Sequence, residues 1–100
     1  MGYYNFSDLA IEDIEEICGF IAETNASFAS QLFDEIRKKC KLVANFPNMG
    51  KNYDDVDINL RGFIVYDYVV FYYPVQDGIK IARIIHGKRE LKLLFEEFKE

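Results

Sequence analysis

The sequence predicts an α+β fold in which two helices pack on one face of a single β-sheet. Between residues 8 and 43, apolar residues recur at the spacing of amphipathic helices. Between residues 61 and 86, three runs of β-branched and aromatic residues are separated by turn signals, as in an antiparallel meander. Half of the 100 residues are apolar, which suffices for one core, so we expect a single domain over residues 1–100.

The first half of the chain is expected to form a short strand and a helical hairpin. Tyr3–Phe6 is rich in aromatic residues and predicts a strand that pairs into the sheet. Ser7 is a suitable N-cap for a helix that runs to about Glu23, and Asn25 for a second helix.

Each expected helix has one buried face. In the first helix this face holds Ala10, Ile14, Ile17, Cys18 and Ile21. The side of the first helix expected to face water holds Glu12, Asp13, Glu15 and Glu16. In the second helix the buried face holds Ala29, Leu32, Phe33, Ile36, Cys40 and Val43.

Turn signals divide the second half of the chain. Pro47 and Gly50 end the second helix, and residues 51–60 are expected to form a polar loop. Strands are expected over 61–66, 68–73 and 79–86, and strand formers on both faces of 68–73 predict a central position. The turns between them are expected at Asp67 and at Asp77-Gly78.

The last strand and the residues after it hold the chain's only histidine. Strict alternation puts Ile79, Ile81, Arg83 and Ile85 on one face and Lys80, Ala82, Ile84 and His86 on the other. A short C-terminal helix is expected from Lys88, with Leu91, Leu94, Phe95 and Phe98 at helical spacing.

Charge is distributed unevenly along the chain, whose formal net charge is −5. No Lys or Arg precedes Arg37, whereas Lys80 to Lys92 holds five basic residues and His86 against Glu90 alone. An acidic protein with one basic patch is a poor match for non-specific nucleic-acid binding, which needs an extended positive surface. The patch fits a local anion site or an acidic partner.

Two cysteines, Cys18 and Cys40, are the only ones in the chain. Their offset in the expected hairpin is too large for a disulfide, so we expect free thiols and a reducing, cytoplasmic location. No apolar run approaches the roughly 20 residues that a membrane span needs. The cysteines and the histidine do not form a zinc-ligand pattern, and no phosphate-binding loop occurs, so we expect no metal and no cofactor.

Several short motifs resemble, in this order and spacing, the ParE branch of the RelE/ParE toxin–antitoxin superfamily. They are Ser7-Asp8-Leu9-Ala10 with Asp13-Ile14, Phe46-Pro47 with Gly50, Leu60-Arg61, Tyr68-Val69-Val70-Phe71-Tyr72, and Arg83-Ile84-Ile85-His86-Gly87-Lys88-Arg89-Glu90. The resemblance implies a RelE/ParE-like fold and a bacterial toxin of the plasmid-stabilisation type. It also implies neutralisation by a cognate ParD-like antitoxin in a hetero-oligomer, and inhibition of DNA gyrase through protein–protein contact.

This interpretation assigns roles to residues late in the chain. The expected target-binding residues are Arg61, Arg83, His86, Lys88 and Arg89, and the expected antitoxin-binding residues are Leu91, Leu94 and Phe95. In this interpretation the protein is a binding module with no catalytic residue, no direct nucleic-acid contact and no membrane contact.

Two other functions remain open at this point. A RelE-like, ribosome-dependent mRNA endonuclease would use Arg61 and Arg83 on phosphates and His86 as general acid or base. Such nucleases commonly also use a tyrosine near the C-terminus, and none follows Tyr73 here. A weakly toxic family member that only binds its antitoxin is the third possibility.

Purely structural roles are open for the same residues. Arg61 would pair with the acidic cluster at Asp54–Asp57 and anchor that loop. Arg83 would cover apolar surface with its stem, and His86 would hydrogen-bond the backbone at the strand end.

Overall fold

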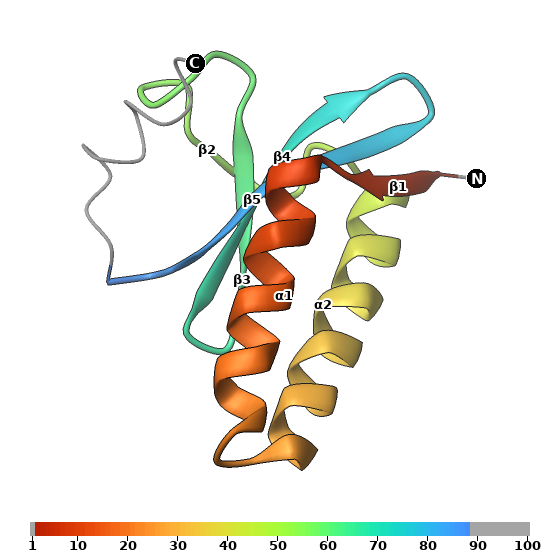
Figure 1. Ribbon diagram of the computed structural model, residues 1–100. Helices are drawn as coiled ribbons and strands as arrows, with labels where there is room; N and C mark the ends of the chain where they lie inside the picture. Colours follow the sequence, from red (N-terminus) through yellow and green to blue (C-terminus); the bar gives the residue numbers. More distant parts are fainter. Residues whose placement is uncertain (1, 89–100) are drawn as a thin grey trace.

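Two helices lie against one face of a five-stranded sheet in the computed structural model of the chain, which describes residues 2–88 (Figure 1). The elements are β1 (Tyr3–Phe6), α1 (Asp8–Ala22), α2 (Ala26–Asn45), β2 (Lys51–Asn52), β3 (Arg61–Val65), β4 (Tyr68–Val75) and β5 (Gly78–His86). The predicted α+β fold, with its helical hairpin and three-stranded meander, is confirmed. The predicted C-terminal helix falls outside the described residues.

Side-chain caps start both helices, as the sequence predicts. Ser7 Oγ accepts a hydrogen bond from the Ala10 N–H at 3.1 Å, and Asn25 Oδ1 accepts one from the Phe28 N–H at 3.0 Å. Ser7 has a second role, because its hydroxyl donates to the Ala82 carbonyl at 2.9 Å. The start of α1 is therefore attached directly to β5.

The strands lie in the order β1-β5-β4-β3-β2, so the central position predicted for residues 68–73 is confirmed. β3, β4 and β5 pair antiparallel, whereas β1 pairs parallel to β5. Gly78 lies in this parallel pair opposite Tyr3, where an added Cβ would come within 1.8 Å of the Tyr3 carbonyl oxygen. A side chain at this position would force the two strands apart.

Two-residue turns join the meander strands. Tyr66 and Asp67 connect β3 to β4, and Tyr66 has a φ of 52°. Gln76 and Asp77 connect β4 to β5, with a φ of 67° at Asp77. The second turn lies one residue earlier than predicted, because Gly78 already pairs with β1 and β4.

The prediction that side chains alternate strictly between the two faces along β5 is wrong after Ile81. Tyr72 pairs with Ile81 but the preceding Phe71 pairs with Arg83, so β5 has one extra residue at this point. Such a bulge exchanges the faces of the residues that follow it. Ile84 therefore joins the helix-facing core with Ile79 and Ile81, and Ile85 lies on the opposite face.

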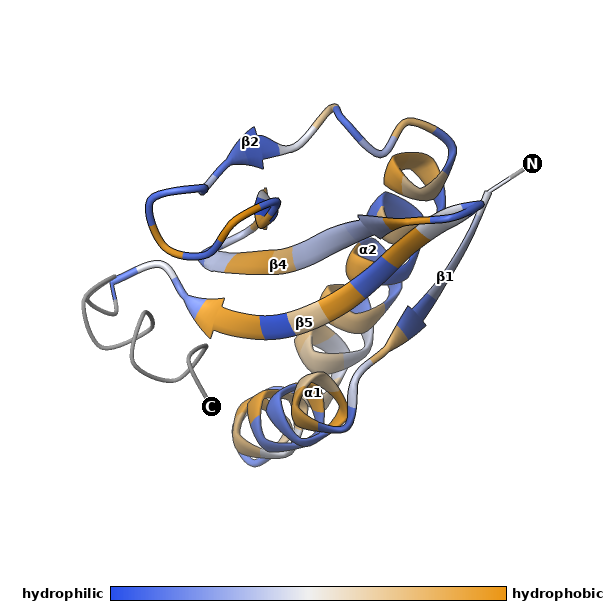
Figure 2. Ribbon diagram, turned by 90° about the horizontal axis from the view of Figure 1, so that it is seen from above, coloured by the Kyte–Doolittle hydropathy of each residue, from blue (hydrophilic) through white to orange (hydrophobic). Residues whose placement is uncertain are grey.

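The larger core lies between the helices and the sheet, where apolar residues of α1, α2, β4 and β5 meet (orange in Figure 2). Leu32, Ile36, Cys40 and Val43 of α2 are fully buried in it. Phe33 was expected on this face but is 39% exposed, because its side chain lies toward α1 at the outer surface of the hairpin. None of the helices in residues 2–88 is long and apolar enough to cross a membrane.

A smaller core covers the other face of the sheet, and it corrects the prediction of a polar loop over 51–60. Lys51 and Asn52 form β2 on β3, while Val56 and Leu60 are buried against Phe71 and Ile85. The aspartates of this segment give it the pattern of a polar loop. Its two apolar residues, Val56 and Leu60, are recognised as buried only when their contacts with the sheet are known.

Asp13 was expected on the water-facing side of α1 but lies over the edge of β5. β1 covers β5 only as far as Ile81, so the following residues lack a strand neighbour on that side. The Asp13 carboxylate accepts from Arg83 Nε at 2.8 Å and from Arg83 Nη2 at 3.0 Å. It also accepts from the Ile84 N–H at 3.0 Å. The side chains of Asp13 and Arg83 are only 12% and 13% exposed.

Both cysteines are free thiols, as predicted: Cys40 is buried in the larger core and Cys18 is half-buried. Burial raises the pKa of the Cys40 thiol to about 12, and burial raises the pKa of Cys18 as well. Since the thiolate is the reactive species, both should react slowly in the native state.

Replacing Asp13 by Ala should lower the free energy of unfolding by about 2–4 kcal/mol, because it removes the nearly buried carboxylate that binds the Arg83 guanidinium at two nitrogens and accepts from the Ile84 N–H. Urea unfolding followed by circular dichroism measures this. The matched control is Glu12→Ala on the exposed side of the same helix, which should change stability by less than about 0.5 kcal/mol. Equal effects of the two substitutions would contradict the role given to Asp13.

Cys40 should resist modification by a disulfide reagent such as DTNB at pH 8 until the protein unfolds. With a pKa of about 12, its thiolate fraction at that pH is about one in ten thousand, and its side chain has no solvent access. Cys18, which is partly exposed, should react first. Cys18→Ser and Cys40→Ser variants assign the two phases, and two equally fast thiols in the native protein would show that Cys40 is not buried.

Candidate target-binding site

The end of β5 carries two of the predicted target-binding residues at the surface. His86 and Lys88 are both exposed. The Lys88 N–H donates to His86 Nδ1 at 3.2 Å, and the imidazole lies edge-on to the Tyr68 ring with 5.3 Å between ring centroids. The predicted hydrogen bond between His86 and the backbone is thus present. These contacts fix the ring while leaving it accessible from solvent.

Arg83 precedes this surface and is held within the fold by the bidentate pair with Asp13. A planar guanidinium bound at two nitrogens by one carboxylate has a well-defined orientation. The structural role predicted for Arg83 was to cover apolar surface with the aliphatic part of its side chain. Its guanidinium also forms an ion pair with Asp13. Arg83 connects α1 to β5 just before the exposed strand end.

Arg61 lies at the start of β3, well away from the β5 end. Its Nη1 donates to the carbonyls of Asn48 and Gly50 at 3.0 and 2.7 Å. The expected pairing with the Asp54–Asp57 cluster is not the contact that forms. Arg61 instead anchors the segment that follows α2, because that segment passes directly over the first residue of β3.

Tyr72 and Tyr73 fix the same region from the neighbouring strand. The Tyr72 hydroxyl donates to the Pro47 carbonyl at 2.7 Å and accepts from the Gly50 N–H at 3.0 Å. The Tyr73 hydroxyl donates to Asp57 Oδ2. Burial raises the pKa of both phenols, and the Asp57 carboxylate raises that of Tyr73 further. Both phenols are therefore neutral hydrogen-bond donors that position loops.

The register of the sheet separates two of the three residues that an endonuclease would need, Arg61 and His86. Arg61 pairs with Tyr72 at one end of β3, whereas His86 pairs with Tyr68, which pairs with Val65 at the other end. Four residues of strand correspond to roughly 13 Å. Arg61 and His86 therefore lie at opposite ends of these strands, whereas Arg83, which pairs with Phe71 beside Tyr72, lies at nearly the level of Arg61 with β4 between them.

A hollow of about 300 Å³ lies beside His86, between α1 and the last residues of β5. Its walls include Phe20 and Glu16 from α1 and Tyr68 from β4. Phe20 is 75% exposed, which is unusual for so large an apolar side chain. Burial raises the pKa of Tyr68, and the Asp67 charge adds to this, so its phenol stays neutral. The hollow can hold an apolar side chain of a protein partner.

Phe20 and Tyr68 were not among the predicted site residues. Phe20 gives a signal in the sequence, because it interrupts the polar side of α1 three residues after Ile17. Tyr68 gives none, because nothing in the sequence distinguishes it from the other tyrosines of the meander. Arg89, Leu91, Leu94 and Phe95 lie outside the described residues, so their roles remain predictions. Within residues 2–88, no group of three His, Cys, Asp or Glu side chains is placed to hold a metal ion.

Comparisons with known proteins agree with this architecture. A family profile described as the ParE toxin of the type II toxin–antitoxin system parDE matches residues 4–91. Among solved structures, the chain is similar to one described as the chromosomal ParDE TA system from P. aeruginosa, with a TM-score of 0.71 and 16% sequence identity. That match covers 86% of this chain and 96% of the other, and at this identity it shows the shared fold.

A comparison with curated proteins finds no match to the chain. The family match nevertheless extends over nearly all of the sequence, and it includes every helix and strand except the first residue of β1. It agrees with the resemblance drawn from the sequence motifs. The chain belongs to the ParE toxin family of type II toxin–antitoxin systems.

Proposed function

We propose that this toxin inhibits DNA gyrase by protein–protein binding and that a cognate ParD-like antitoxin neutralises it in a toxin–antitoxin complex. Membership of the ParE family supports the proposal, because the resemblance drawn from the sequence motifs implies gyrase as the target of ParE-type toxins and ribosome-bound mRNA as that of RelE-type toxins. A cytoplasmic location, where gyrase acts, is part of the same proposal. No catalytic residue is assigned.

The observation that carries this choice is the separation of Arg61 from His86, together with the binding of the Arg83 guanidinium by Asp13. A nuclease must bring its phosphate-binding and proton-transferring groups to within a few ångströms of one reacting phosphate. Here Arg61 is bound to two carbonyls and Arg83 to a carboxylate, and His86 lies across the sheet from Arg61. This arrangement supports a protein-binding surface in preference to a nuclease active site.

The proposed gyrase-binding surface is the β5 end, formed by His86 and Lys88 together with Phe20 and Tyr68 around the adjoining hollow. Exposed aromatic rings beside cationic groups are typical of residues that dominate protein interfaces. In this proposal Arg83 positions the strand end and Arg89 extends the basic surface along the sequence, while Arg61 lies apart from this surface at the start of β3. The surface fits a partner with acidic and apolar groups.

Induction of the toxin in a bacterial host should stop DNA synthesis before protein synthesis, as followed by incorporation of labelled thymidine and leucine. Purified toxin should also inhibit supercoiling by purified gyrase in the absence of ribosomes. If translation fails first and gyrase keeps its activity, the proposal is wrong, and Arg61, Arg83 and His86 become candidates for an RNA-cleaving site.

The double variant His86→Ala/Lys88→Glu should weaken gyrase inhibition by at least ~10-fold while the protein stays folded, because both side chains are exposed. The measurement is the toxin concentration that halves supercoiling. The matched control is Lys39→Glu on the exposed side of α2, which changes charge equally at a distant position. Equal loss of inhibition in both variants would point to net charge and would exclude the β5 end as the contact.

A further inference from the structure

The turn between β3 and β4 holds a residue in an unusual backbone conformation. Tyr66 has a φ of 52°, whereas the following Asp67 has no positive φ. Two-residue hairpin turns with a positive φ at the first residue alone normally have glycine there, because a side chain is strained at that position. The other described non-glycine residues with a positive φ are Asn59 and Asp77, and both residue types adopt this conformation readily. Among residues 2–88, Tyr66 is therefore the exception.

Packing within the protein does not account for the Tyr66 side chain. Its ring is 48% exposed and lies edge-on to the Phe28 ring, with 5.2 Å between the two centroids. Phe28 is itself only half-buried and is not one of the residues packed against either core. A single aromatic contact contributes about as much as the strained turn costs, so a glycine would serve folding equally well. Strained residues of this kind are found preferentially at functional sites.

Tyr66 adjoins the β5 end through the hydrogen bonds of the turn. Tyr68, the first residue after the turn, pairs with His86. The Gly87 N–H donates to the Asp67 carbonyl at 2.8 Å, so the turn is bonded directly to the residue that follows His86. Figure 1 shows the turn at the same end of the sheet as the last residues of β5. Tyr66 therefore lies beside the proposed gyrase-binding surface.

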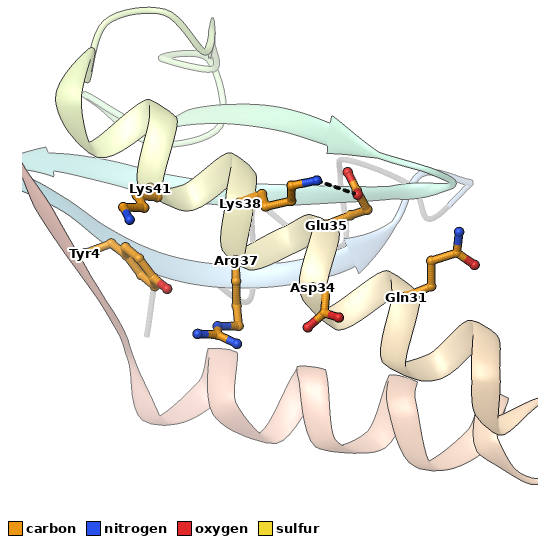
Figure 3. A pocket seen from close by; sticks show the side chains of 7 residues that line it. All are labelled: Tyr4, Gln31, Asp34, Glu35, Arg37, Lys38 and Lys41. Atoms are coloured by element: carbon orange, nitrogen blue, oxygen red, sulfur yellow. Dashed lines mark hydrogen bonds and ion pairs between the residues drawn. The ribbon is translucent and has the colours of Figure 1, made fainter.

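The opposite end of the sheet has a different character. There Tyr4 pairs with Ile79 at the start of β5 and borders a hollow of about 530 Å³ on the outer side of α2. Figure 3 shows basic and acidic side chains of α2 together in this hollow, with Lys38 bound to Glu35 at 3.5 Å. A hollow lined mainly by charged side chains is less suited to a protein interface, because charged residues are depleted at interface cores.

We propose that Tyr66 is a contact residue of the gyrase-binding surface and that its ring packs against an apolar side chain of gyrase. This inference rests on the proposed function and adds a residue to the β5 end. Tyrosine is among the residues that contribute most to protein interfaces, because its ring buries a large area at a small cost in side-chain entropy. The tight turn and the contact with Phe28 restrict the ring before binding, so little conformational freedom is lost in the complex.

Substitution of Tyr66 by glycine tests the proposal, because it should separate folding from inhibition. Tyr66→Gly relieves the strain of the positive φ and loses the Phe28 contact, so the Tm should stay within ~4 °C of the wild-type value. The toxin concentration that halves supercoiling by purified gyrase should nevertheless rise by at least ~10-fold. Tyr66→Phe keeps the ring and should inhibit gyrase within ~3-fold of the wild type.

Two matched controls lie at the opposite end of the sheet. Asp77→Gly makes the same kind of change in the turn between β4 and β5, where φ is 67°. Tyr3→Thr removes another tyrosine ring, which is 58% exposed, and puts a strand-forming residue in its place. Both variants should inhibit gyrase as the wild type does.

The outcomes separate this inference from the proposed function. If the wild type inhibits gyrase and Tyr66→Gly inhibits it equally well, Tyr66 is not a contact residue and the gyrase proposal stands. A fall of more than ~10 °C in the Tm of Tyr66→Gly would assign the side chain to folding and would also overturn the inference. A wild-type toxin that leaves gyrase fully active would overturn both proposals.

Discussion

The Asp13 carboxylate holds together the point at which β1, α1 and β5 meet. β1 pairs with β5 only as far as Ile81, and beyond that residue the edge of β5 would be left with unpaired backbone groups. Ser7 and Asp13 take over from β1, since the Ser7 hydroxyl donates to the Ala82 carbonyl and Asp13 accepts from the Ile84 N–H. α1 thus replaces a strand as the neighbour of β5, which an unpaired edge requires.

The bulge in β5 makes this replacement possible and determines what lies beyond it. The extra residue at Ala82 brings Ile84 to the helix-facing core and directs Ile85 to the smaller core, so both faces of the strand end are anchored. Arg83 bridges to Asp13 at the same point. With its edge and both faces fixed, β5 can present His86 at an exposed end on a rigid support, as a binding surface requires.

A second set of anchors holds the other side of the sheet. Tyr72 and Arg61 bind main-chain groups between Pro47 and Gly50, while Tyr73 binds Asp57. Arg61, which an endonuclease would use on phosphates, here binds the carbonyls of a loop. The β5 end lies outside these anchors.

The sequence by itself determined the class of fold, the capped helical hairpin, the central strand and the membership of a toxin family, because these follow from periodicity, turn chemistry and motif order. Tertiary structure alone decided the partners of single polar residues. In the sequence, Asp13 is one of several acidic residues on the solvent-facing side of a helix. Its position over the edge of β5 follows from the end of β1 at Phe6, which leaves that edge without a strand neighbour after Ile81. The burial of Val56 and Leu60 was not predicted, because the segment after β2 is rich in aspartate. The bulge in β5 places Ile84 and Ile85 on the faces opposite to those that strict alternation predicts. The 13–83 pair joins residues 70 positions apart, and local sequence patterns do not encode such a contact.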